Sequence, residues 1–369
     1  MGSGLVFSNI FARPLRSITT ALAIGLEVAL ILLIVGLSQG MIEETSKRME
    51  GVGADIALQP PNSSVLLAAS TAAMSVKISQ LIQNIEGVDA VTPIFLQFNT
   101  TGGMGLIWGI DLKSFNQVSR GFIFLSGSNF KKPDDVIIDD IYARANNLKV
   151  GDQLNLMNHS FQICGIVENG KGSRVFIPIA KMQELVGSHD KATLMLIKCI
   201  ANDKIPSVID KLGKSLKSYP IFDMNEFIAQ MTDANKDFGP LKYFTNTVIS
   251  VATLIGFFII FLSMYTTVTE RIHEIGILRS LGANQLYVSF VFLKEALALG
   301  AIGFLLGVGL TFTGRLLFSA ISPTLYHDLS VGWIVGTGCL ALLSASLGAL
   351  YPAFRAGCQD PLEALAYNN

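Results

Sequence analysis

Four long apolar stretches divide the chain, and one long polar segment separates the first stretch from the other three. A helix rises ~1.5 Å per residue, so about 20 apolar residues cross the ~30 Å hydrocarbon layer of a membrane. Each stretch reaches that length. We therefore predict four transmembrane helices, at residues 18–42 (including a polar extension), 244–269, 286–320 and 331–354.

The residues that flank these stretches predict the orientation of the chain. Arg13 and Arg16 precede the first stretch, and Arg271 and Arg279 follow the second, whereas the link 321–330 holds no lysine or arginine. Lysine and arginine accumulate on the cytoplasmic side of membrane proteins. We therefore expect both termini in the cytoplasm, and the link and the long polar segment outside it.

Two terminal segments are predicted to lie on the cytoplasmic side. Residues 1–17 combine apolar and basic positions, which predicts an interfacial helix that ends near Pro14. Residues 355–369 form a tail, in which Asp360 and Glu363 occupy the capping positions of a last short helix.

The polar segment 43–243 carries most of the charges and prolines and mixes two periodicities. Short β-branched runs predict strands, and apolar residues three to four apart predict helices. The predicted strands are 136–138, 161–167, 175–177 and 194–197, and the predicted helices are 77–87, 178–186 and one through 205–216. The expected fold class is an α-helical membrane protein with four transmembrane helices plus an α+β extracytoplasmic domain inserted between the first and second spans.

Composition agrees with such a division. Half of the 369 residues are apolar and 15% are charged, a mixture of membrane and water-exposed parts. The net charge of −1 carries no electrostatic signature of nucleic-acid binding. Cys164 and Cys199 lie in the polar segment, where either a disulfide or two free thiols fits the sequence.

The segment 270–285 is the polar interruption between the second and third spans. Apolar residues recur at every third position, which predicts one apolar stripe on a short helix: Ile272, Ile275, Leu278 and Leu281. Gly282 follows where a left-handed cap is expected. The pattern fits either a helix that a soluble partner binds or a solvated turn.

Three residues inside the spans are candidate helix-packing positions. Glu27 is a carboxyl group within the first span, where a charge costs ~3 kcal/mol at the centre of the bilayer. It is either a proton or substrate site or a packed contact with another helix, and we favour the contact. Gly303 and Gly307 form a G-x-x-x-G pair that lets two helices approach closely, including at a dimer interface.

No catalytic or metal-binding signature is found. The run from Gly165 to Lys171 has the glycine spacing of a phosphate-binding loop, but Gly172 stands where that motif requires serine or threonine. We interpret it as a strand followed by a turn. We assign no catalytic residue, no metal ligand and no directly bound cofactor.

Two segments resemble the paired signatures of FtsX-like/MacB-type ABC transporter permeases: R-I-H-E-I-G-I-L-R-S-L-G-A after the second span and Y-P-A-F-R-A-G-C-Q-D-P-L-E-A-L at the end. L-K-V-G-D-Q-L-N-L, F-Q-I-C-G-I-V-E and V-F-I-P-I-A resemble the family's outer domain. The order of one span, a domain and three spans also matches. The likeness covers nearly the whole chain.

The resemblance implies a function. The chain would be the permease subunit of a transporter in the inner membrane of a bacterium, working with a separate ATPase that binds ATP and with a second permease as a homodimer or heterodimer. A periplasmic adaptor and membrane lipid are further implied partners. The segment 270–285 would be the coupling helix that contacts the ATPase, through Arg271, Ile272, Glu274, Ile275, Gly276, Leu278, Arg279, Leu281 and Gly282.

In that family, ATP-driven motion reaches the outer domain through the long helices. Such motion would export or extract a lipid, a lipoprotein, or a small-molecule or peptide substrate. The alternative is an FtsX-like signalling regulator that activates a cell-wall hydrolase. In either case the chain itself would not be an enzyme.

Overall fold

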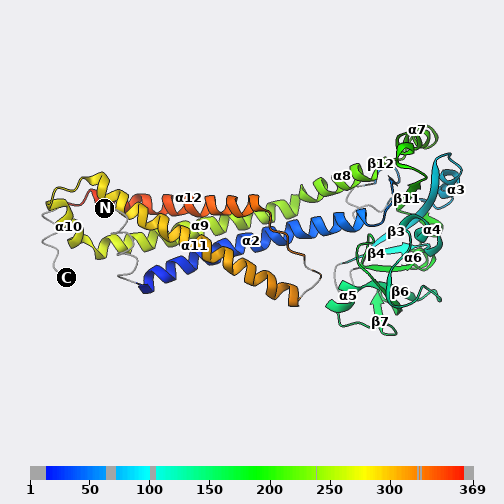
Figure 1. Cartoon of the computed structure of the whole chain (residues 1–369), viewed down its shortest axis with the longest axis horizontal. Helices are drawn as coiled ribbons and strands as arrows, with labels where there is room; N and C mark the ends of the chain where they lie inside the picture. The colour runs from blue at the N-terminus through cyan, green and yellow to red at the C-terminus, as the bar shows by residue number, and fades with distance from the viewer. Residues whose placement is uncertain are drawn as a thin grey trace. The chain divides into compact units, whose positions relative to one another are not determined.

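The computed structural model describes residues 14–63, 72–99, 105–237, 239–321, 324 and 326–360 (Figure 1). The chain divides into two compact units. The helical unit comprises Met1–Gly40, Gly239–Ala320 and His327–Asn369, and the sheet domain comprises Met41–Phe238 and Ile321–Tyr326. Residues 1–13, which carry most of the predicted interfacial helix, and residues 361–369, which carry most of the predicted last helix, lie outside the described residues.

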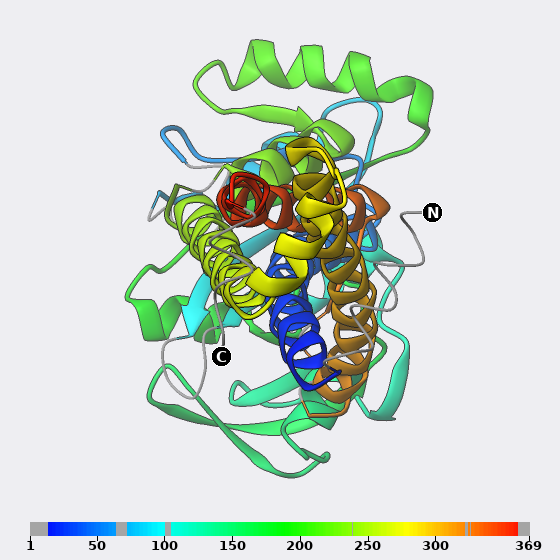
Figure 2. The same cartoon turned by 90° about the vertical axis from the view of Figure 1, so that its left-hand side faces the viewer.

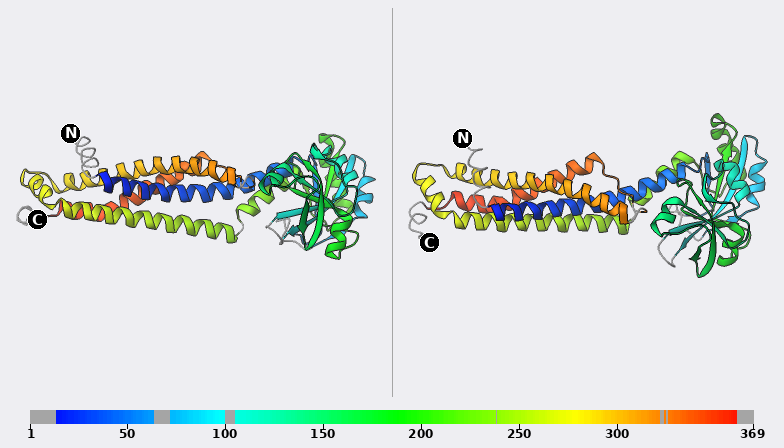
Figure 3. Two further views of the ribbon diagram at one scale, coloured as in Figure 1. Left: turned by 90° about the horizontal axis from the view of Figure 1, so that it is seen from below. Right: turned by 60° about the horizontal axis from the view of Figure 1, so that its bottom comes forward.

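Four helices of the chain are long and apolar enough to cross a membrane: α2 (Pro14–Glu50), α9 (Gly239–Glu270), α11 (Gln285–Ile321) and α12 (Val331–Gly357). They cover the four predicted spans. Within the described residues, α2 already includes Pro14–Ser17, ahead of the predicted start of the span at residue 18. Helix α10 (Ile272–Ser280) lies at the end of the bundle where α9 ends and α11 begins (Figure 3).

Small residues bring the long helices into close contact. Seen end-on, α9 and α12 lie side by side, as do α2 and α11 (Figure 2). In the first pair, Gly348 of α12 faces the backbone of Phe257 and Phe261 in α9. The bundle has a continuous apolar core: Ile24, Val28, Leu32, Ile260, Met264, Ala296, Leu299, Ala341, Ala345 and Ala349.

The sheet domain is built on one mixed ten-stranded sheet with the order β12-β1-β11-β3-β4-β9-β6-β8-β5, in which β7 pairs with β8. A separate pair joins β2 and β10. The strands are β1 (Ile56–Leu58), β2 (Met74–Ser75), β3 (Val88–Asn99), β4 (Gly105–Ile110), β5 (Phe124–Gly127), β6 (Asp135–Asp139), β7 (Gln153–Leu156), β8 (His159–Val167), β9 (Val175–Pro178), β10 (Lys191–Ala192), β11 (Leu194–Cys199) and β12 (Ile221–Asp223).

Both faces of the central strands of this sheet are buried. Successive strand residues point to opposite faces, so Leu196 of β11 joins one apolar core and Ile197 the other. Helices cover both faces, because residues of α4 and α8 join the first core and residues of α3, α5, α6 and α7 join the cores of the other face. These helices are α3 (Ile78–Gln83), α4 (Leu112–Ser119), α5 (Asp140–Ala145), α6 (Ile179–Val186), α7 (Ile205–Ser215) and α8 (Met224–Lys236), with a short 3-10 helix η1 (Asn202–Lys204) before α7.

The two cysteines of this domain do not form a disulfide. Cys164 lies in β8 and Cys199 in β11, with four strands between them in the sheet, and both are free. Burial raises the pKa of the Cys164 thiol to about 12 and the pKa of the Cys199 thiol to about 11. Because the thiolate is the reactive form, both side chains act as apolar packing groups at neutral pH.

Candidate functional site

Helix α10 is a short helix with a well-formed end between two long ones. After Leu281, Gly282 adopts a φ of 92°, a left-handed conformation that costs glycine nothing. The N–H of Gly282 donates to the carbonyl of Arg279, and the N–H of Ala283 donates to the carbonyl of Leu278, each at 3.0 Å. This pair of bonds is a Schellman motif. Gly282 therefore ends α10 as the sequence predicted, and the chain turns there into α11.

One face of α10 is packed against the bundle. Ile275 is 1% exposed, and it joins an apolar cluster with residues of α9, α11 and α12: Val268, Val288, Phe292, Ala353 and Ala356. Gly276 is buried next to it. Burial of one large aliphatic side chain contributes roughly 1.5–3 kcal/mol, so this cluster holds α10 to the ends of three long helices.

A buried ion pair adds to this attachment. The Nη1 atom of Arg271 lies 3.6 Å from the Oε2 atom of Glu295, and the two side chains are 5% and 3% exposed. Arg271 stands between α9 and α10, and Glu295 lies in α11. We expected Arg271 to face a partner; the structure instead turns it inward, toward a carboxylate whose charge the buried guanidinium needs. Glu295 was not predicted as a site residue.

Other side chains of the segment are exposed. Leu281 is 80% exposed, Ile277 43% and Leu278 36%. Glu274 and His273 are exposed beside them, and Ile272 and Arg279 are half-buried. The expected apolar stripe is therefore divided, because Ile275 packs inward, Leu281 faces outward and Leu278 is only partly exposed.

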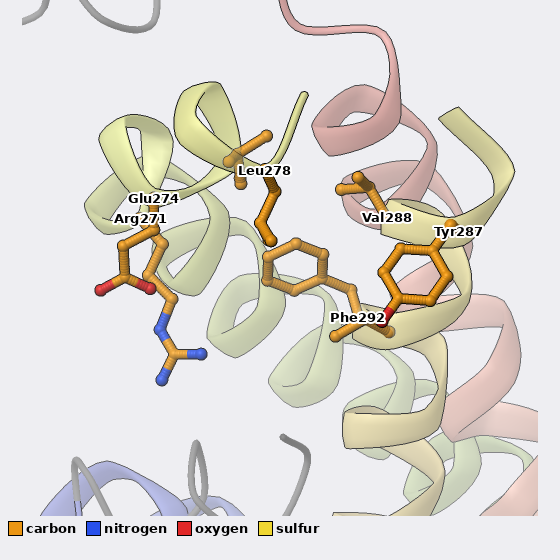
Figure 4. Close-up of a pocket in the computed structure, with 8 residues that line it drawn as sticks. Arg271, Glu274, Leu278, Tyr287, Val288 and Phe292 are labelled. Atoms are coloured by element: carbon orange, nitrogen blue, oxygen red, sulfur yellow. The ribbon is translucent and has the colours of Figure 1, made fainter. Parts of the chain in front are cut away.

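A small cleft lies between α10 and the first turns of α11 (Figure 4). Its volume is about 80 Å³, and Leu278 and Phe292 point toward each other in it, with Tyr287 and Val288 on the α11 side. A cavity needs only ~10–15 Å³ by this measure to hold one water, so the cleft has room for several waters or one small side chain.

Polar bonds join the helix ends around α10. Arg16 of α2 forms an ion pair with Glu270 of α9 at 2.9 Å. Arg355 of α12 donates a hydrogen bond to the hydroxyl of Tyr265 in α9 at 2.7 Å. The hydroxyl of Ser289 in α11 donates to a carbonyl of α12 at 2.9 Å. With the Arg271–Glu295 pair, these bonds connect all four long helices near α10.

The candidate packing residues within the spans lie at helix contacts of the same chain. Gly303 and Gly307 of α11 face Ile24 and Val28 of α2, and a Cβ atom at either glycine would lie 2.6 Å from a Cβ atom of α2. The carboxyl group of Glu27 lies against Gly256 of α9. Glu27 is 6% exposed, and among the described residues its Oε2 atom has no hydrogen-bond partner.

Neither a metal site nor a phosphate site is visible in the part of the chain that the structure describes. No group of three or more His, Cys, Asp or Glu residues converges there. In the run that resembles a phosphate-binding loop, the Nζ atom of Lys171 donates to the carbonyl of Ser119 within the sheet domain. That lysine therefore holds the turn and does not point into an open anion site.

The fold and these contacts define a multi-pass membrane protein with one inserted sheet domain and a short helix fixed to the end of its bundle. A family model described as the MacB-like periplasmic core domain matches residues 17–214, and a model described as the FtsX-like permease C-terminal region matches residues 246–361. The chain therefore belongs to the family of ABC transporter permeases with a MacB-like core domain and an FtsX-like C-terminal region.

Relatives along the whole chain agree. The uncharacterized ABC transporter permease YknZ of Bacillus subtilis is 24% identical, over 98% of this chain and 98% of its own length. YvrN of the same organism is also 24% identical over 98% of each chain. The macrolide export ATP-binding/permease protein MacB of Neisseria gonorrhoeae is 23% identical over 97% of this chain, which matches 59% of that protein.

Two solved structures are also similar. The periplasmic region of MacB from Actinobacillus actinomycetemcomitans aligns with 48% of this chain and 92% of its own, at 13% identity and a TM-score of 0.38. The extracellular domain of YknZ aligns with 46% of this chain and 99% of its own, at 14% identity and a TM-score of 0.35.

Proposed function

We propose that this permease transmits the motion of an ABC ATPase to its sheet domain, and that α10 is the surface on which the ATPase acts. The observation that carries the proposal is the division of α10 into two faces. Ile275 and Arg271 are fixed in the bundle, whereas Leu281 and Ile277 are exposed and Leu278 is partly exposed at the cleft. An apolar surface of this kind on a rigid support is typical of a protein-binding site.

The connections of α10 explain how a push on it would spread. It follows α9 directly, it joins α11 through a short capped loop, and its buried face contacts α12. A displacement of α10 therefore moves the ends of three long helices together. The sheet domain is inserted between α2 and α9, so α9 and the last turns of α2 carry that displacement to it.

The family and the basic residues beside the spans support the proposed setting. Both termini and α10 lie in the cytoplasm of a bacterium, and the sheet domain lies outside the inner membrane. Two permeases and an ATPase that binds ATP form the working complex, with a periplasmic adaptor as a further partner. The substrate class is a lipid, a lipoprotein, or a small molecule or peptide that the sheet domain moves from the membrane surface outward.

Cysteine labelling in intact cells tests this topology. His159 in β8 and the exposed His273 in α10 are replaced singly by cysteine in a chain from which Cys339 and Cys358 have been removed. We expect a membrane-impermeant maleimide to label His159→Cys in intact cells and His273→Cys only after permeabilisation. Labelling of both positions from the same side would contradict the proposal.

Replacement of Leu281 tests the docking role of α10. Leu281→Asp adds a carboxylate to a side chain that is 80% exposed, so the fold should tolerate it. In a complex with the ATPase, that charge would be buried without a partner, at a cost of more than ~1.4 kcal/mol. We expect the stimulation of ATP hydrolysis by the permease to fall by about tenfold or more.

The matched control is Leu81→Asp in α3 of the sheet domain, where the side chain is 63% exposed. It should leave the stimulation unchanged. Leu278 is a less decisive position, because it also lines the cleft against α11 and its replacement would disturb folding as well as docking. Equal stimulation by Leu281→Asp and wild type would refute the docking surface.

A further inference from the structure

The glycine-rich run that resembles a phosphate-binding loop contacts another part of the sheet domain. The run starts at the end of β8 and leads into the turn before β9, in which Gly170 and Gly172 adopt φ values of 110° and 74°. Only glycine adopts such angles at little cost. The turn therefore needs glycine at these two positions to adopt its shape.

The turn receives the last residues of α2, which belong to the sheet domain. The N–H of Gly172 donates to the carbonyl of Arg48 at 2.7 Å. Gly51, the residue after α2, lies so close to the carbonyl of Gly170 that a Cβ atom at position 51 would collide with it. The end of the first long helix is thus seated backbone against backbone in the turn.

The same turn is braced against the core of the domain. A Cβ atom at Gly172 would overlap the ring of Trp108. Trp108 is fully buried and makes edge contacts with Phe115 and Phe176. A displacement of the turn therefore acts directly on the central strands β4 and β9.

Arg174, at the end of this turn, contacts the charged and polar groups around it. Its Nη2 atom donates to Oε1 of Glu44 on α2 at 2.8 Å and to the carbonyl of Thr324 at 3.1 Å. Its Nη1 atom lies 3.9 Å from Oδ2 of the buried Asp139. The guanidinium is 13% exposed, and Arg48 also pairs with Glu44, at 3.2 Å. Two arginines and two carboxylates balance in one poorly solvated cluster.

Thr324 gives this cluster a second connection to the helical part of the chain. It belongs to the link between α11 and α12, in the part of that link assigned to the sheet domain. Arg174 therefore holds, with one side chain, the extension of α2 and the α11–α12 link. A guanidinium suits this task because its planar donors reach several acceptors in fixed directions.

We propose that motion of α2 and of the α11–α12 link enters the sheet domain through the Gly170–Arg174 turn, which we call the seat. Arg174 is its positioning residue. The inference rests on the proposed function, because it assumes that nucleotide-driven motion starts at α10. It adds the place where that motion is received. A turn fixed only to the core, or only to α2, would not pass displacement between them.

Hydrogen–deuterium exchange tests the seat in the full-length chain, reconstituted in lipid nanodiscs with its ATPase. Exchange is compared with and without ATP plus vanadate, for peptides from α10 and from Gly170–Pro178. In the wild type we expect nucleotide to change exchange in both. In Arg174→Gln, we expect the change at Gly170–Pro178 to be lost, while the change at α10 and ATP hydrolysis remain.

Two further variants keep the experiment decisive. Glu44→Gln removes the carboxylate charge that Arg174 and Arg48 share on α2, and it leaves Arg174 with Asp139 and Thr324. It serves if Arg174→Gln folds poorly, and we expect the same loss. Arg144→Gln removes a surface ion pair with Asp140 in the same domain, and it should behave as wild type.

The outcomes separate the two proposals. If Arg174→Gln and Glu44→Gln keep the wild-type response at Gly170–Pro178, the seat is overturned and the proposed function stands. If the wild-type chain shows no nucleotide response even at α10, the proposed function fails and the seat fails with it.

Discussion

A Gly307→Val variant is expected to enter the membrane and then to fail to pack. A Cβ atom at this position would lie 2.6 Å from Cβ of Val28 and 2.7 Å from the carbonyl oxygen of Gly25. No rotamer relieves a clash with backbone, so α2 and α11 must separate. Overpacking of a core typically costs ~1–3 kcal/mol, and we expect the upper end of that range.

Thermal unfolding in detergent measures this effect. At about 3 kcal/mol, the unfolding temperature should fall by roughly 5–10 °C. Gly309→Val is the matched control, because it lies on the same helix and a Cβ atom there meets nothing within 4 Å. We expect the control to unfold near the wild-type temperature.

The same pair of variants separates two roles of the G-x-x-x-G pair. In the structure, Gly303 and Gly307 receive α2 of the same chain. If Gly307→Val unfolded like the wild type but ran as a monomer where the wild type is a dimer, the glycines would act between two copies. The spacing of the glycines predicts close approach of a helix, but it does not say which helix.

The sequence predicted four strands of the sheet domain but missed β3, whose pattern depends on its pairing with strands distant in the sequence. The predicted strands at 136–138, 161–167, 175–177 and 194–197 lie in β6, β8, β9 and β11. Strand β3 was missed, although it is 12 residues long and pairs with β11 and β4. Burial on both faces removes its polar–apolar alternation, and Pro93 interrupts its pattern.

Helix geometry explains why the apolar stripe of α10 was only partly predicted. A step of three residues falls about 60° short of a full turn, since a helix has ~3.6 residues per turn. Three such steps from Ile272 to Leu281 add up to about half a turn. Residues in this repeat therefore cannot share one face, and Ile275 packs inward while Leu281 faces outward.

The partner of Arg271 could not be predicted from local sequence, but its carboxylate left a signal. Glu295 interrupts the apolar run of α11, as Glu27 interrupts that of α2. The rule that made Glu27 a candidate, that a charge within a span needs a partner, applies equally to Glu295. The rule does not identify the partner of Glu295, because Arg271 and Glu295 meet only after α11 folds back against α9.

Removing either member of this pair is expected to loosen α10. Arg271→Gln or Glu295→Gln breaks a buried ion pair by removing one of its two charges, which typically costs ~3–5 kcal/mol. The helix should then leave its position on the bundle more often. Limited digestion with trypsin measures how often α10 leaves the bundle, because trypsin cleaves after arginine and Arg279 of α10 is half-buried. We expect cleavage after Arg279 to become faster by at least about tenfold.

Two comparisons show whether the pair itself is responsible. Arg16→Gln breaks a neighbouring ion pair with Glu270 that is 22% and 45% exposed, and it should cost less than ~1 kcal/mol. The double variant Arg271→Met/Glu295→Leu removes both buried charges, so it should recover most of the lost protection. If the double variant is cleaved as fast as Arg271→Gln, the packing of the arginine stem holds α10 and the charge pair does not. If all variants are cleaved at the wild-type rate, the apolar cluster around Ile275 is sufficient to fix α10.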